Sequence, residues 1–160
     1  MFPEIVPYLV FLHVLGAILA FGPTFAYSIM GSMAAKEPQH ANFSSRQVDM
    51  IGKRLVYPLG IFQGITGVLI ILAAGYSVMS RAWLLVAIVL YLFTLTYALT
   101  VQRNALHHLI ELTSSPPPPG ATGPSPEIVA TVKRIQQGGI LLAAMIVIIV
   151  FLMVVKPTFG

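Results

Sequence analysis

Four long apolar runs are the feature that most limits what this chain can fold into. Each is close to or above the roughly 20 residues that an α-helix needs to cross a hydrocarbon core of about 30 Å. The runs cover Ile5–Met33, Leu55–Tyr76, Ala82–Val101 and Gly138–Val155. The chain of 160 residues is 57% hydrophobic and 9% charged, whereas about a quarter of the residues of a soluble domain are charged. We therefore expect an all-α integral membrane protein.

Sequence patterns typical of helix starts lie before two of these runs, and they predict helices that extend beyond the membrane. Ser44 with Gln47 three residues later forms a weak capping box, so the second helix should start before its apolar run. Ser125-Pro126-Glu127 is a strong helix start, with a capping serine, a proline and an acid in the first turn. We predict one domain over 1–160, an antiparallel transmembrane four-helix bundle with helices at about 5–33, 46–76, 82–112 and 126–156.

The connections between these helices differ in character. The segment 113–125 is rich in proline, which favours an extended inner loop. The connection Ser77–Arg81 is short, so the second and third helices should pack together. Cationic residues gather in the first and third connections, which predicts that these face the cytoplasm and that both termini lie on the outer side. They are Lys36, Arg46, Lys53, Arg54, Arg103, Lys133 and Arg134, against Arg81 and Lys156 on the other side.

His13 is the only ionisable residue deep inside an apolar run. An ionisable group within the membrane is a functional-site hypothesis by default. Steps of three and four residues place it on a stripe of small and polar residues, which should face the other helices. The stripe is His13, Ala17, Ala20, Thr24, Tyr27 and Gly31.

Depth along the helices selects the candidate neighbours of His13. At 1.5 Å per residue, His13 lies about 12 Å below the outer surface. Four polar side chains reach similar depths, Tyr91 and Thr66 at about 14 Å and Gln63 and Thr94 at about 18 Å. His107 and His108 lie at about 38 Å, too far to share one haem with His13.

Three roles for His13 follow from its position. It is a neutral imidazole hydrogen-bonded to one of these neighbours, or a haem or metal ligand completed by another group or subunit, or a group that transfers protons or binds quinone.

The remaining motifs are weaker. His107 and Glu111 are one turn apart and could hold a metal, but we expect a solvated helix end and predict no metal site. Gln136, Gly139 and Ala143 form the small stripe of the fourth helix, which turns Met145 away from the bundle as a haem ligand. Gly60-xxx-Gly64 is interpreted as a packing pattern.

The run Leu12-His13-Val-Leu-Gly16, followed by Phe21-Gly22-Pro23, resembles an uncharacterised bacterial family of four-helix predicted integral membrane proteins. That family is distantly similar to copper-resistance protein D and to HemJ-type haem-dependent oxidases, which also place a histidine in their first helix. Of the functional residues of these proteins, only the histidine has a counterpart in this chain, His13. The membrane lysine of the HemJ-like oxidases has no counterpart in these runs. The resemblance implies a multi-pass protein of the bacterial inner membrane.

The sequence carries no glycine-rich phosphate loop, no Ser-His-Asp set and no cysteine. We therefore predict a non-enzymatic membrane protein, an accessory or assembly subunit of a larger energy-converting complex. Its partners would be lipid and other membrane subunits or further copies of itself, with no nucleic acid. The alternative is a b-type haem or copper protein with His13 as ligand, and haem b is the one cofactor that we consider.

Overall fold

The computed structural model describes residues 3–115 and 123–157, and within these ranges the chain is helical with no strand. The elements are η1 (Pro3–Ile5), α1 (Val6–Lys36), η2 (Pro38–His40), α2 (Ala41–Ile51), η3 (Gly52–Val56), α3 (Tyr57–Ala74), α4 (Ala82–Tyr97), η4 (Ala98–Gln102), α5 (Arg103–Leu112) and α6 (Pro126–Val155). Both η3 and η4 are single π-helical turns inside longer helices. The predicted all-helical class is confirmed.

Four helical segments are long and apolar enough to cross a membrane, Val6–Lys36, Pro38–Ala74, Ala82–Leu112 and Pro126–Val155. The first, third and fourth agree with the predicted bounds to within a few residues. At the start of the fourth, the Ser125 hydroxyl accepts a hydrogen bond from the Ile128 amide at 3.3 Å, as its sequence signal predicts. Part of the predicted loop 113–125, residues 116–122, lies outside the described residues.

The predicted start of the second helix near residue 46 was wrong. The helical segment begins at Pro38, directly after Glu37, and α2 has no side-chain cap. The Ser44 hydroxyl donates to the Met30 carbonyl of α1 at 3.4 Å, so it caps nothing. Packing of α2 against α1 and α5 explains the longer helix, since tertiary contacts override a weak local signal.

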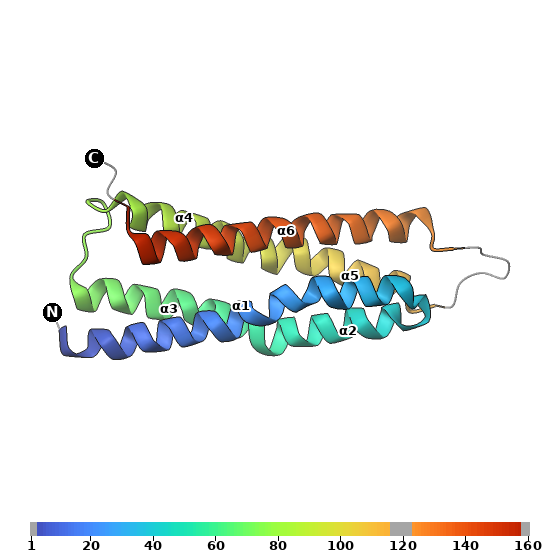
Figure 1. Cartoon of the computed structure of the whole chain (residues 1–160), viewed down its shortest axis with the longest axis horizontal. Coiled ribbons are helices and arrows are strands. Elements are labelled where there is room, and N and C mark those ends of the chain that lie inside the picture. The colour runs from blue at the N-terminus through green and yellow to red at the C-terminus, as the bar shows by residue number, and fades with distance from the viewer. Residues whose placement is uncertain (1–2, 116–122, 158–160) are drawn as a thin grey trace.

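The four segments lie along one long axis, and both ends of the chain lie at the same end of the molecule (Figure 1). In that view α1 runs beside α3, and α4 runs beside α6. These two pairs hold the main helix contacts, so α3 and α4 are not each other's principal partners as their short connection suggested. They meet through Tyr91 of α4, whose hydroxyl donates to the Gly60 carbonyl of α3 at 2.8 Å.

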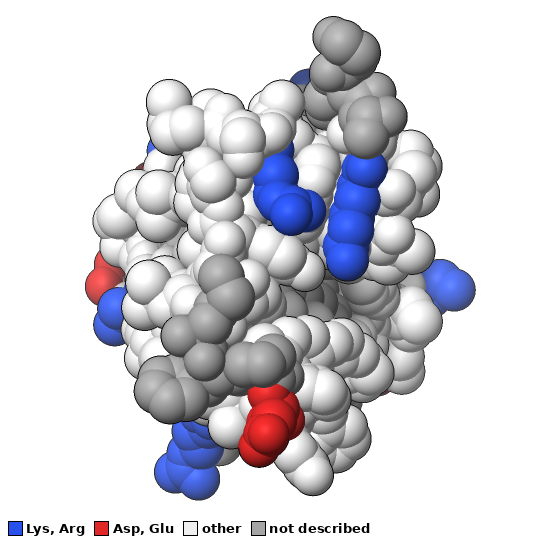
Figure 2. All heavy atoms as spheres, turned by 90° about the vertical axis from the view of Figure 1, so that its left-hand side faces the viewer, with Lys and Arg blue, Asp and Glu red and all other residues white. Residues whose placement is uncertain are grey.

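The best-buried apolar cluster lies near the end of the molecule that holds the termini. Trp83, Leu84 and Ala87 of α4 pack there with Leu152 of α6. Lys and Arg side chains lie on part of this end beside an acidic one (Figure 2), and Lys156 lies 5.9 Å from the centre of the Trp83 ring. Most other large apolar side chains are exposed, which is the surface that a lipid environment requires.

The inward face of α6 differs from the predicted one. Its buried residues are Thr131, Gly138, Ile146 and Leu152. Gln136 and Gly139 are exposed and Ala143 is half-buried, so the small stripe expected to face the bundle lies mostly outside it. Gly138 takes the inward place because Gln102 and Tyr97 of the preceding helix pack against its backbone. Met145, predicted to point away, is half-buried.

Gly138 and Gly139 are adjacent and offer a matched test of this rotation. Gly138→Ala would press a methyl group onto the Gln102 amide and to 3.0 Å from the Tyr97 hydroxyl. We expect it to lower the free energy of unfolding by about 1–3 kcal/mol, as overpacking does. Gly139→Ala meets nothing within 4 Å and should be neutral or stabilising by up to about 1 kcal/mol through helix propensity. Unfolding in mixed micelles measures both, and equal effects would contradict the rotation of α6.

Candidate functional site

His13 lies on α1 and contacts α3 through its ring. Its Nδ1 atom lies 2.8 Å from the Thr66 hydroxyl oxygen. The Thr66 side chain is fully enclosed, with 2% of its surface exposed, whereas His13 is half-buried. The two residues are 53 positions apart in the chain, so this bond joins two of the helices that are long and apolar enough to cross a membrane.

The hydrogen bonds of Thr66 assign the proton on His13. The Thr66 hydroxyl lies 3.1 Å from both the Phe62 and the Gln63 carbonyls of its own helix. A hydroxyl has one proton to donate, and here it goes to these carbonyls. We infer that Thr66 accepts from His13 and that the ring proton is on Nδ1, because the bond at 2.8 Å does not by itself fix the direction. The other ring nitrogen, Nε2, keeps its lone pair.

Small residues let α1 and α3 approach closely enough for this bond. Gly16 and Ala20 are the buried residues of α1. An added Cβ at Gly16 would lie 3.2 Å from the Phe62 ring, and one at Gly67 would lie 3.4 Å from Cε1 of His13. The layer around His13 therefore depends on glycine on both helices, in agreement with the predicted inward stripe of α1 up to Tyr27. Gly31, the last member of that stripe, is exposed.

Of the four neighbours proposed for His13, Thr66 forms the bond. Tyr91 bonds instead to the Gly60 carbonyl, and the Thr94 hydroxyl donates to the Leu90 carbonyl of its own helix at 2.7 Å. Gln63 is buried beside Gly16, and its Oε1 atom has no hydrogen-bond partner among the described residues. Depth alone could not separate these four, because rotation about each helix decides which side chain meets the imidazole.

Gly64 has a specific function in the Gly60-xxx-Gly64 pattern. An added Cβ there would lie 2.5 Å from the Tyr91 hydroxyl oxygen. The glycine pair thus forms a notch for a tyrosine of α4, which supports the interpretation as packing. The hydroxyl of Tyr27, a member of the predicted inward stripe of α1, is buried without a partner in the described chain.

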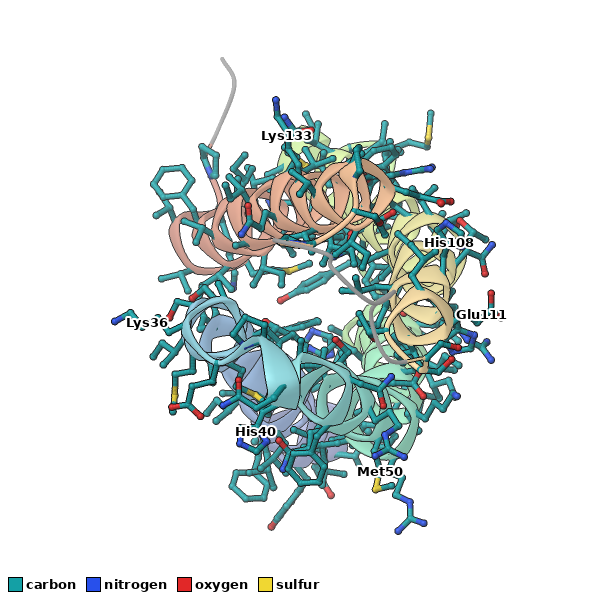
Figure 3. The ribbon with its side chains drawn as sticks, turned by 90° about the vertical axis from the view of Figure 1, so that its right-hand side faces the viewer. Lys36, His40, Met50, His108, Glu111 and Lys133 are labelled. Carbon is teal, nitrogen blue, oxygen red and sulfur yellow. The ribbon has the colours of Figure 1, made fainter. Side chains whose placement is uncertain are left out.

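The other histidines bind acidic side chains at the opposite end of the molecule. His107 Nε2 lies 3.0 Å from Asp49 Oδ1, and Lys53 Nζ lies 2.7 Å from the other oxygen of Asp49. His108 Nε2 lies 3.1 Å from Glu127 Oε1. Figure 3 shows His40 and His108 on different sides of this end. In residues 3–115 and 123–157 no three His, Cys, Asp or Glu side chains group as metal ligands.

These acidic partners could not be read from the local sequence. Asp49 is 58 residues from His107, and neither the expected solvated helix end nor the alternative of a metal held by His107 and Glu111 involved it. Only the packing of α2 against α5 brings Asp49 to His107.

The bond between His13 and Thr66 makes a measurable contribution to stability. Thr66→Val keeps the shape but leaves the Nδ1 proton without an acceptor, so we expect a loss of roughly 0.5–2 kcal/mol, the range of hydrogen bonds between membrane helices. Thr66→Ser keeps the hydroxyl and should lose less. A double-mutant cycle of Thr66→Val with His13→Ala in micelles measures the coupling, and a coupling energy near zero would contradict the bond.

Comparison with known proteins matches residues 7–157 to the family DUF2269, described as a predicted integral membrane protein. No curated protein and no solved structure matches the chain. The expected similarity to copper-resistance protein D and to HemJ-type proteins gains no support and stays a prediction. The match includes nearly all of the four apolar helices, and the chain therefore belongs to the DUF2269 family of predicted integral membrane proteins.

Proposed function

We propose that this protein is a non-enzymatic membrane subunit that acts by assembling with other membrane subunits in a larger energy-converting complex. The observation that carries the proposal is the outward small face of α6, defined by Gln136, Gly139 and Ala143. Small residues on a membrane helix let a second backbone approach, and polar ones hydrogen-bond across the contact. A face of this kind that the bundle itself does not use is suited to a partner helix.

The geometry at Gly139 supports this use. An added Cβ at Gly139 meets nothing within 4 Å, and Gln136 is exposed three residues earlier, at the edge of the apolar run. A partner helix from another subunit or from a second copy of this chain would cover both.

The lone histidine inside the membrane suggests the type of complex. Proteins that move protons or electrons use such residues, because imidazole titrates near neutral pH. Here its Nδ1 atom is bonded within the chain, which is consistent with a supporting subunit.

The same proposal includes an orientation. We place the four helices in alternating directions across a bacterial inner membrane, with both termini outside. The support is the excess of Lys and Arg in the first and third connections, which stay on the cytoplasmic side. A reporter fused after Gly160 tests it, and a cytoplasmic carboxyl end would contradict it.

Gly139→Leu tests the proposed assembly face. Leucine would separate the backbones, so the protein extracted from its own membrane in mild detergent should shift several-fold toward the single chain on native gels. The matched control is Ala144→Leu, which adds bulk at an exposed position about 140° around the helix. If wild-type protein migrates as a single chain, or if both variants behave alike, this face is not the assembly site.

A second candidate function, a haem b or copper protein with His13 as ligand, has one observation in its favour. A histidine that donates from one ring nitrogen to a protein oxygen, with the other nitrogen bare, has the arrangement usual for metal-ligating histidines. The bond to Thr66 is of this kind, and His107 and His108 are engaged elsewhere. Met145 or a group from another subunit would have to complete the site.

The absorption spectrum of the same preparation separates the two candidates. A Soret band that His13→Ala removes would favour haem ligation over the accessory role. A colourless complex that still contains several subunits would contradict the haem alternative.

A further inference from the structure

The second feature of the molecule that points to a ligand is a pocket at the end opposite the chain termini. It has a volume of about 300 Å³, well above the roughly 30 Å³ that one water occupies in the liquid. It opens between η4 and α5 on one side and α6 on the other. Its polar lining consists of Thr100, Asn104, His108, Thr131 and Arg134.

Hydrogen-bond donors without a protein acceptor gather in this pocket. Thr131 is 8% exposed, and its hydroxyl makes no hydrogen bond among those recorded for residues 3–115 and 123–157. The same is true of the Asn104 amide, and Arg134 forms no ion pair within that part of the chain. Thr131 is a buried residue that still lines the pocket, and Asn104 and Arg134 are exposed at its edge, so this set is suited to a ligand that accepts several hydrogen bonds and carries negative charge.

The charges around the pocket favour an anion. Arg134 is the cation in its lining, whereas Lys133 and Arg103 are next to lining residues in the chain but do not line the pocket. Glu127 is the nearby acid, and its carboxylate lies 3.1 Å from His108 Nε2. Glu111 lies one turn beyond His108 on α5 and is exposed. The guanidinium of Arg134 is the group that can bind a phosphate through two parallel hydrogen bonds.

The depth of the pocket suggests where the phosphate comes from. Thr100 lies at the end of the third apolar run, and Arg134 is four residues, or about 6 Å, before the fourth begins at Gly138. Lipid headgroups occupy this level. Val101 and Ala105 give the pocket an apolar side that fits the glycerol end of a lipid better than a free ion.

We propose that this pocket binds the phosphate of an anionic phospholipid, held by Arg134, Asn104 and Thr131. Basic pockets between membrane helices on the cytoplasmic side are suited to such headgroups. The inference does not depend on the proposed assembly of the chain with other subunits, because all of its residues lie on this chain.

Two neighbouring cations provide a matched test. Arg134→Gln and Lys133→Gln remove the same charge one residue apart, but Lys133 does not line the pocket and points away from the bundle in Figure 3. Full-length protein in detergent is titrated with phosphatidylglycerol, and retained lipid is measured by native mass spectrometry. We expect Arg134→Gln to weaken retention by about tenfold and Lys133→Gln by about twofold or less. Phosphatidylcholine with the same acyl chains should bind more weakly than phosphatidylglycerol.

A third variant leaves the charge unchanged. Thr131→Val removes a hydroxyl that lines the pocket, and we expect retention to fall by about threefold or more, with helicity unchanged by circular dichroism. If Arg134→Gln does not fold, lipid retention by Thr131→Val still tests whether the pocket binds the lipid. Equal losses in Arg134→Gln and Lys133→Gln, or no loss in Thr131→Val, would overturn the pocket as the lipid site. Complete displacement of the lipid by millimolar inorganic phosphate would show that the site takes a soluble anion and would also overturn the proposal.

Discussion

The constraint on which this structure depends is that polar groups inside a membrane find no water and must bond to protein. His13 Nδ1 bonds to the Thr66 hydroxyl, to which we assign the role of acceptor because that hydroxyl donates to carbonyls of α3. The Tyr91 hydroxyl of α4 donates to the Gly60 carbonyl of α3. The bond of His13 with Thr66 and the bond of Tyr91 with Gly60 therefore each join two different helices. In this way the few polar residues of the apolar runs fix how α1, α3 and α4 are turned toward one another. Among the residues that the structure describes, the exceptions are the side-chain oxygens of Tyr27 and Gln63, which are buried without partners.

Glycine placement decides how close the helices come. Gly16, Gly64 and Gly138 each have a side chain from another helix against their backbone, whereas Gly22 and Gly139 have open space. The same residue type therefore has two functions in this chain. Inward glycines allow the contacts within the bundle, and the outward Gly139 belongs to the surface that we propose for a partner. The end of the bundle opposite the chain termini differs, because charged pairs and a pocket lined by Arg134 take the place of glycine contacts there.

Positions along the membrane normal could be predicted from the sequence, whereas rotations could not. The rise per residue is constant in a helix, so counting residues placed Thr66 near His13 and kept His107 and His108 away from it. The direction in which a side chain points depends on its neighbours. Gln102 and Tyr97 select Gly138 over Gly139, which reversed the prediction for Gln136 and Gly139. The bond between Asp49 and His107 also required the packed helices, as did the early start of the second helix.

The central claim is that Thr66 holds His13 with the proton on Nδ1 and the lone pair on Nε2. Nitrogen NMR of ¹⁵N-histidine-labelled protein in lipid reports this tautomer directly, with the His13 signals assigned by their absence in His13→Ala. A protonated Nδ1 and a bare Nε2 that change in Thr66→Val are the predicted result. A protonated Nε2 beside a bare Nδ1 would contradict the account, because Thr66 would then be the donor and His13 would have no free nitrogen for a ligand.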